Sequence, residues 1–210
     1  MTPADKVTTL RIILAPVFFL LYNLHKLIPP LFSSPSAALW LVPALWVIFI
    51  GAELTDMWDG MIARRRGEVS DFGKLYDPFA DTIMQISLFF CFVWDNLLPV
   101  IPFLLILYRE FGILFVRNLM LRRGISLGAR MGGKIKTVTY IAAGALALAA
   151  SSLQRLSGAV DSWVPWYTRF YLPCARAAVI VFIIAVILAL ASFGDYVKVY
   201  RAAVKGKPAE

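Results

Sequence analysis

An all-α membrane protein with six transmembrane helices is the fold class that this sequence predicts, on the grounds of composition, apolar runs and charge placement. Hydrophobic residues make up 60% of the 210-residue chain and charged residues 16%, and the mean hydropathy is +0.74. Soluble domains are about 45–50% apolar and about 25% charged. We expect residues 1–210 to form a single membrane domain.

Six stretches are long and apolar enough to cross a bilayer core, which takes about 20 mostly apolar residues. Their approximate bounds are 9–25, 37–56, 74–95, 99–121, 135–153 and 174–197. The first resembles a signal peptide, but no small-residue cleavage site follows it closely, so we expect a retained helix. The connection over 154–173 is rich in Trp and Tyr and is expected at the outer membrane interface.

Lysines and arginines set the orientation, because positively charged flanks of membrane helices stay cytoplasmic. Of the 21 such residues, fifteen lie at one set of helix ends, four at the alternate set and two within the fourth span. Both termini and the segment 55–82 are therefore predicted to be cytoplasmic. The net charge of +8 is divided among short loops, which suits anionic lipid headgroups and makes nucleic acid a poor partner.

The segment TDMWDGMIARRRGEVSDFGKLYDPFADT, residues 55–82, gathers five aspartates in an otherwise apolar chain. Asp56 and Asp59 are three positions apart at the end of the second span, and Asp77 and Asp81 are four apart at the start of the third. Each pair therefore shares a helix face. Neighbouring carboxylates repel one another unless a cation compensates them, and oxygen ligands without nearby His or Cys favour Mg²⁺ or Mn²⁺ over zinc.

Small residues and an arginine accompany these aspartates. Gly60 and Ala63 follow the first pair, and Gly73 precedes Asp77 by one turn. Their missing side chains leave a slot in which a flat group can approach the backbone. The guanidinium fork of Arg64 suits phosphate oxygens. Carboxylates, divalent metal, arginine and slot together predict a site for a nucleotide diphosphate.

From Asp56 to Asp81 the segment reads D-x2-D-G-x2-A-R-x8-G-x3-D-x3-D, which resembles the signature of the CDP-alcohol phosphotransferases at every position. The six-span layout is similar to that family as well. The resemblance implies that an alcohol displaces CMP from a CDP-linked lipid, with two divalent ions between the carboxylates and the diphosphate. It also implies a homodimer in the inner (cell) membrane, with its active site facing the cytoplasm.

The resemblance assigns roles residue by residue. Four aspartates look like metal ligands: Asp56, Asp59, Asp77 and Asp81. Asp81 also looks like the catalytic base that takes the proton of the acceptor hydroxyl. The CDP part of the donor is expected to be held by Asp56, Gly60, Ala63, Arg64 and Gly73. Thr82 stands where many relatives have a lysine. Pro78 biases Asp77 away from a helical conformation.

The acceptor site must lie outside this signature. Arg109, Glu110 and Arg117 are in the fourth span, where charges facing lipid would be costly, so we expect them to face the interior. The next loop supplies Lys134 and Lys136 in the run GGKIKT. The four cations are candidate ligands of an acceptor phosphate. The alternative is that Arg117 and the lysines are ordinary positive flanks.

This stretch, and the opening run TTLRIILAPVFFLLY, are similar to the phosphatidylglycerophosphate synthase branch of the family. The resemblance implies CDP-diacylglycerol as donor and sn-glycerol 3-phosphate as acceptor. Inositol phosphate, inositol and serine remain alternative acceptors. A cation transporter or channel with an acidic pathway is the alternative from another class, although it predicts acids spread through the bilayer depth rather than gathered at one face.

Three further residues invite simpler readings. Glu53 lies three positions before Asp56, and we expect it to have a structural role. The alternative is that Glu53 faces the same cavity as the aspartates. Cys91 and Cys174 lie in or beside apolar runs without disulfide or zinc spacing, and we expect both to be apolar core residues.

Overall fold

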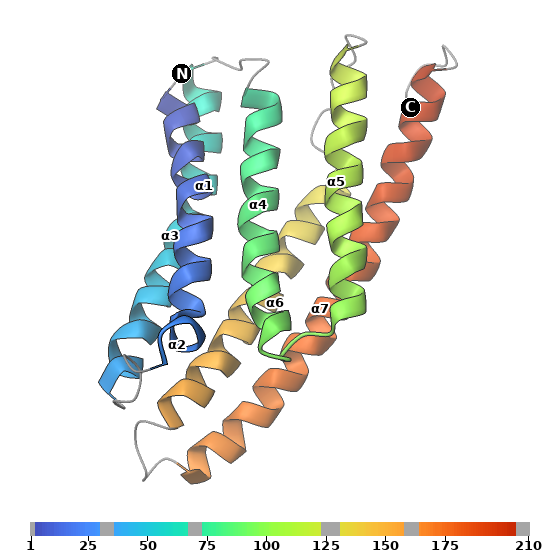
Figure 1. Cartoon of the computed structure of the whole chain (residues 1–210). Coiled ribbons are helices and arrows are strands. Elements are labelled where there is room, and N and C mark those ends of the chain that lie inside the picture. The colour runs from blue at the N-terminus through green and yellow to red at the C-terminus, as the bar shows by residue number, and fades with distance from the viewer. Residues whose placement is uncertain (1–2, 30–35, 67–72, 123–130, 158–163, 205–210) are drawn as a thin grey trace.

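The computed structural model describes residues 3–29, 36–66, 73–122, 131–157 and 164–204, and every element within these ranges is a helix. The helices are α1 (Pro3–Tyr22), α2 (Leu24–Leu27), α3 (Ser36–Arg66), α4 (Gly73–Trp94), α5 (Val100–Arg122), α6 (Met131–Ser157) and α7 (Val164–Val204). The six long helices form one bundle in which α6 runs obliquely behind α4 and α5, while α7 crosses near the lower end of α5 and continues beside it (Figure 1). The predicted all-α class is confirmed.

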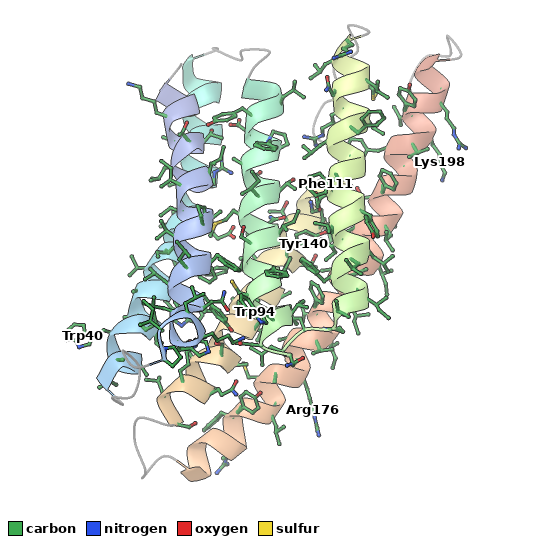
Figure 2. The ribbon with its side chains drawn as sticks, viewed as in Figure 1. Trp40, Trp94, Phe111, Tyr140, Arg176 and Lys198 are labelled. Atoms are coloured by element: carbon green, nitrogen blue, oxygen red, sulfur yellow. The ribbon has the colours of Figure 1, made fainter. Side chains whose placement is uncertain are left out.

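Three of the described helices are long and apolar enough to cross a membrane, judged by length and composition. The stretches are Ala37–Thr55 in α3, Ile135–Ser157 in α6 and Arg169–Ala202 in α7. Trp40 is 81% exposed and points away from the bundle, whereas Tyr140 is only 2% exposed (Figure 2). Large exposed apolar side chains are expected where lipid is the solvent, and we treat the chain as a helical membrane protein.

The connection between α6 and α7 is shorter than predicted. Helix α6 continues to Ser157 and α7 begins at Val164, so much of the predicted 154–173 connection is helical. Pro165 does not prevent this, because the first turn of a helix tolerates proline. The hydropathy pattern marked the apolar part of each helix, and the helices extend beyond it.

Helix α1 ends at Tyr22, three residues before the predicted end of the first span. The Asn23 side chain donates to the carbonyl of Phe19 at 2.9 Å, and Lys26 N donates back to the Asn23 carbonyl at 2.9 Å. Asparagine competes with the helix through such local hydrogen bonds. The chain therefore turns at Asn23 into the short helix α2.

The turn between α4 and α5 is built around Asn96, which has a φ of 58°. Asparagine tolerates this left-handed conformation better than most residues, and helices commonly end on such a residue. Asp95 N donates to the Cys91 carbonyl at 3.1 Å and Leu97 N to the Phe92 carbonyl at 2.9 Å. These bonds satisfy carbonyls at the end of α4 and bring α5 back beside it.

Small residues allow the helices to approach closely, as they do in membrane bundles, where apolar burial alone does not drive helices together. Both α6 and α7, which pack extensively on each other, contribute buried alanines: Ala143, Ala147, Ala150, Ala178, Ala185 and Ala189. A Cβ on Gly144 would lie 2.9 Å from Leu88 and 3.3 Å from Phe49, and one on Gly112 would lie 3.0 Å from Phe193. A side chain at either glycine would therefore require the facing Leu88, Phe49 or Phe193 side chain to move. Cys91 is buried in the core and Cys174 packs against it, and both are free thiols, as predicted.

A cluster of ion pairs and hydrogen bonds connects the helices at the end of the bundle opposite the termini. Asp95 pairs with Lys26 at 2.5 Å and with Arg155 at 3.5 Å. Arg155 also donates to the Tyr22 carbonyl at 3.0 Å and to Ser151 at 3.1 Å. The cluster thus joins α1, α2, the α4–α5 turn and α6.

Candidate active site

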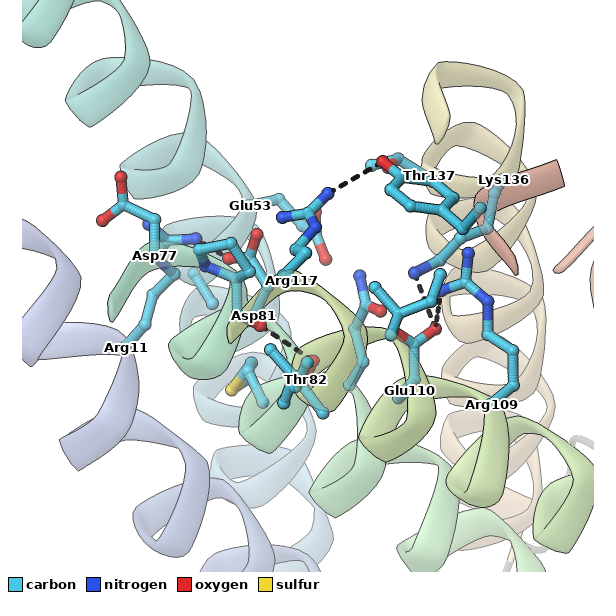
Figure 3. A pocket seen from close by; sticks show the side chains of 17 residues that line it. Arg11, Glu53, Asp77, Asp81, Thr82, Arg109, Glu110, Arg117, Lys136 and Thr137 are labelled. Carbon is cyan, nitrogen blue, oxygen red and sulfur yellow. Dashed lines mark hydrogen bonds and ion pairs between the residues drawn. The ribbon is translucent and has the colours of Figure 1, made fainter. Parts of the chain in front are cut away.

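A cavity of about 290 Å³ opens between the helices and is lined by side chains from α1, α3, α4, α5, α6 and α7. This volume is near the lower end of the range of roughly 300–1,000 Å³ that ligand pockets occupy. Its lining divides into an acidic side and a basic side, with Arg117 between them in the view of Figure 3.

The acidic side is formed by α1, α3 and the start of α4. Asp77 and Asp81 both line the cavity, as their four-residue spacing predicted, and Glu53 of α3 joins them. The hydroxyl of Thr8 donates to Asp77 Oδ1 at 2.5 Å. The guanidinium of Arg11, which is 2% exposed, forms an ion pair with Asp81 Oδ1. Helix α1 therefore holds both carboxylates of α4.

The expected departure from helical geometry at Asp77 does not occur. Both Asp77 and Pro78 lie inside α4, which begins at Gly73. Pro78 has no N–H and so removes one intrahelical hydrogen bond, and α4 remains helical on both sides of it. Thr82, which stands where many relatives have lysine, is buried and donates to the Pro78 carbonyl at 2.8 Å.

The rest of the signature lies on α3 and at the start of α4. The backbone of α3 is helical through Arg66, but the structure describes nothing beyond the backbone for five predicted site residues: Asp56, Asp59, Gly60, Ala63 and Arg64. The same holds for Lys134 at the start of α6. Asp56 follows Glu53 by three positions, so the two positions share a face of α3. Gly73 is the first residue of α4.

The basic side is formed by α5 and α6. Arg109, Arg117 and Lys136 line the cavity, as predicted, together with Glu110. Lys136 Nζ lies 2.6 Å from Glu110 Oε1, and Arg109 Nη1 donates to the same oxygen at 2.8 Å. Two of the predicted acceptor cations are therefore paired with one buried carboxylate.

Helix α7 supplies partners that the sequence did not indicate. Arg117 Nη2 donates to the hydroxyl of Tyr196 at 3.1 Å, and Arg117 Cζ lies over the Tyr196 ring at 5.6 Å from the centroid. Arg109 donates through Nε to the Ala189 carbonyl at 3.1 Å and through Nη2 to Ser192 at 3.5 Å. Sequence reasoning missed these partners because a single hydroxyl residue in a long apolar run forms no recognisable motif.

Arg11 was also missed, since the sequence placed it among the positively charged flanks. The structure buries it against α4 instead. A charged residue just inside an apolar run was the available signal, and it is the same signal that identified Arg109.

The described side chains contain no group of three His, Cys, Asp or Glu residues placed to hold a metal. Asp77 and Asp81 nevertheless offer two carboxylates to one cavity, and the other two predicted ligands, Asp56 and Asp59, have side chains outside the described part. A hard divalent cation takes oxygen ligands of this kind. Asp77 and Asp81 are thus ligands of the right chemical type for such a cation, and the four-aspartate metal site stays a prediction.

Comparison with known proteins places this architecture. Residues 1–191 match the sequence model of the family described as CDP-alcohol phosphatidyltransferase. The chain is 37% identical over 199 residues to the CDP-diacylglycerol–glycerol-3-phosphate 3-phosphatidyltransferase of Treponema pallidum (strain Nichols), covering 94% of this chain and 88% of that protein. It is 32% identical over 195 residues to the probable phosphatidylglycerophosphate synthase of Mycobacterium tuberculosis (strain ATCC 25618 / H37Rv), covering 92% and 79%. It is 34% identical over 143 residues to the CDP-diacylglycerol–glycerol-3-phosphate 3-phosphatidyltransferase of Bacillus subtilis (strain 168), covering 66% and 72%. The chain therefore belongs to the CDP-alcohol phosphatidyltransferase family.

Proposed function

We propose that the protein transfers the phosphatidyl group of CDP-diacylglycerol to sn-glycerol 3-phosphate, releasing CMP and forming phosphatidylglycerophosphate for phospholipid biosynthesis. The observation that carries the proposal is that one cavity holds Asp77 and Asp81 on one side and Arg109, Arg117 and Lys136 on the other. A displacement between a nucleotide diphosphate and a phosphorylated alcohol needs both. The names of the relatives from Treponema pallidum and Bacillus subtilis support the same donor and acceptor.

The donor is assigned to the signature segment on α3 and α4. Gly60, Ala63, Arg64 and Gly73, with Asp56, would hold the cytidine and its phosphates. Four carboxylates, those of Asp56, Asp59, Asp77 and Asp81, would hold two Mg²⁺ or Mn²⁺ ions. When bound, the ions supply positive charge at the attacking and leaving oxygens of the displacement.

The acceptor is assigned to the basic side. Lys136 and Arg117 line the cavity and would bind the phosphate of sn-glycerol 3-phosphate, with Lys134 as a further candidate. Arg109 lines the cavity as well, and its guanidinium already donates to Glu110 and to α7. Asp81 takes the proton of the acceptor hydroxyl, whose oxygen forms the new bond to the phosphatidyl phosphorus as the bond to CMP breaks. A carboxylate base needs hydrogen-bond reach to that proton, and Arg11 positions the Asp81 carboxylate for it.

For the membrane arrangement we propose six spans, with α1, α4 and α5 crossing as well as α3, α6 and α7. An even number of spans places both ends of the chain on one side, in agreement with the start of α1 and the end of α7 lying at the same end of the bundle (Figure 1). The excess of lysine and arginine at that end supports a cytoplasmic location for it, and we propose that the membrane is the inner (cell) membrane. We propose that the enzyme works among membrane lipids as a homodimer.

The test is a CMP-release assay on the purified protein with CDP-diacylglycerol and Mn²⁺. We expect CMP release with sn-glycerol 3-phosphate and far less with inositol phosphate, inositol or serine. Preferential release with another of these alcohols would replace the acceptor and keep the chemistry. If no alcohol releases CMP and the protein instead conducts cations in vesicles, the transporter reading takes its place.

A further inference from the structure

Glu110 is the one carboxylate on the basic side of the cavity, within the described part of the chain. The residue is 4% exposed, and its Oε1 atom is the point at which three side chains meet. Lys136 Nζ lies 2.6 Å away, Arg109 Nη1 donates at 2.8 Å and the hydroxyl of Tyr140 donates at 3.0 Å. Figure 3 shows Glu110, Arg109 and Lys136 converging at this side.

The two cations depend on Glu110 to different extents. Arg109 has additional partners on α7, the Ala189 carbonyl and Ser192. Lys136 has Glu110 as its ion-pair partner, and its ammonium lies over the Tyr140 ring at 4.6 Å from the centroid. An ammonium has three donors on a flexible stem, so the Glu110 contact fixes the direction of the Lys136 side chain. Loss of the Glu110 charge would therefore act chiefly on Lys136.

Glu110 also sets the formal charge of the pocket. The described basic side holds three cations, Arg109, Arg117 and Lys136, and one carboxylate, which leaves a net charge of +2. A phosphate monoester carries about −1.5 to −2 at neutral pH, so this side of the cavity matches it. Without Glu110, buried cations would face one another unpaired, which is strongly unfavourable.

We propose that Glu110 is the positioning residue that determines the preference for a phosphorylated acceptor, by orienting Lys136 and holding the pocket at a charge complementary to a phosphate dianion. The inference rests on the proposed function, because it concerns the acceptor subsite of that reaction. Glu110 does not touch the reacting atoms. It acts through Lys136.

The experiment compares Glu110→Gln, Lys136→Met and the double variant, in the full-length protein. We expect Glu110→Gln to raise the KM for sn-glycerol 3-phosphate about tenfold, as loss of a charged contact does, with kcat and the KM for CDP-diacylglycerol changed less than about threefold. If Glu110 acts through Lys136, the double variant is no worse than Lys136→Met alone, because coupled residues are not additive. Tyr140→Phe, which removes one hydrogen bond to Glu110 and leaves every charge in place, is the matched control and should change the acceptor KM much less.

A purely structural role gives a different pattern. It lowers the yield of folded protein, kcat and both KM values together, and its effect adds to that of Lys136→Met. Either that pattern or an unchanged acceptor KM in Glu110→Gln overturns the proposal. Restored acceptor affinity in Glu110→Asp, which keeps the charge, supports it.

Failure of the proposed function can be told apart from failure of this inference. If the wild-type protein uses inositol phosphate instead of sn-glycerol 3-phosphate, the acceptor assignment falls, and the same comparison is made with inositol phosphate. If no alcohol releases CMP, inorganic phosphate serves as the probe in a thermal-shift measurement. Stabilisation of the wild type by phosphate that is lost in Glu110→Gln supports the role of Glu110, and equal stabilisation of the two proteins overturns it.

Discussion

Arg11 of α1 and Asp81 of α4 form an ion pair on the wall of the cavity although they are seventy positions apart in the sequence. The Arg11 side chain is 2% exposed and that of Asp81 is 37% exposed, so the carboxylate reaches the cavity while the guanidinium is enclosed behind it. Thr8, one turn earlier on α1, holds Asp77 in the same way. Helix α1 thus holds Asp77 and Asp81 of α4 in place.

Replacement of Arg11 should therefore reduce turnover without removing the donor site. We expect Arg11→Met to lower kcat about tenfold, since a charge-assisted contact to a partly exposed carboxylate is lost. Arg11→Lys should recover part of the activity, because it keeps the charge but loses the planar fork. Lys6→Met, which removes an exposed cation from the same helix, is the control and should behave as the wild type. Equal kcat in Arg11→Met and Lys6→Met would show that the pair has no catalytic role.

The metal ligands can be tested by isosteric substitution. Asp56→Asn, Asp59→Asn and Asp77→Asn each keep the side-chain shape and remove one negative charge from the ions that stabilise the displacement. Activity should nearly vanish in all three, excess Mn²⁺ should not fully restore it, and EDTA should have the same effect on the wild type. Titration with Mn²⁺ followed by electron paramagnetic resonance should show weakened binding. Near-normal turnover in the three variants would remove the metal proposal.

Asp81 should behave differently if it is the base. General base catalysis contributes about 10²–10⁴-fold, so Asp81→Asn should lower kcat by at least that order with little change in donor affinity. The KM for CDP-diacylglycerol and kcat, measured together by CMP release, separate the two roles. A collapse of donor affinity in this variant would make Asp81 principally a metal ligand.

Donor and acceptor sites should respond to different substitutions. Arg117→Met, Lys134→Met and Lys136→Met each remove a candidate phosphate contact, which is expected to weaken apparent acceptor affinity about ten- to a hundredfold, with donor affinity nearly constant. Arg64→Ala should show the reverse pattern. Lys198→Met, at an exposed cation of α7, is the matched control for the loss of positive charge. Ordinary acceptor saturation curves in all three variants would place the phosphate site elsewhere.

Arg109 calls for a separate expectation. Its guanidinium already donates to Glu110, Ala189 and Ser192, so Arg109→Met should lower the melting temperature as well as any acceptor affinity. Removal of one member of a buried pair leaves the other uncompensated.

The sequence predicted features that depend on spacing within one helix, and it did not predict contacts between helices. Asp77 and Asp81 were placed on a shared face from the helical repeat, and Arg109 and Arg117 were expected to face the interior because charges facing lipid are costly. The structure confirms that each pair lines the cavity. The Arg11–Asp81 and Arg117–Tyr196 pairs join residues seventy and 79 positions apart. No periodicity within one helix encodes which helix lies beside it, and these contacts follow from the packing of α1 on α4 and of α5 on α7.

The thermal stability of the protein should depend on pH through His25, which lies at the end of the bundle opposite the termini. His25 lies on α2, and its Nδ1 is 3.1 Å from Arg155 Nη1 and 3.1 Å from the Tyr22 carbonyl oxygen. Burial first, and then the positive charge of Arg155, lower the pKa of His25; Asp95 opposes this and Lys26 adds to it.

Since the folded pKa of His25 lies below the unfolded value of about 6.5, the unfolded chain binds the proton more readily. The contribution to stability is therefore present at higher pH and is lost as the pH falls from about 6.5 towards the folded pKa. We expect the melting temperature of the wild type to fall between about pH 7.5 and about pH 5.5, and His25→Gln, which cannot titrate, to fall less. Thermal unfolding of both proteins over this range, in one detergent, measures the difference. Parallel pH profiles would mean that other groups carry the dependence, whereas a gap between the two proteins that changes with pH assigns that part of it to His25.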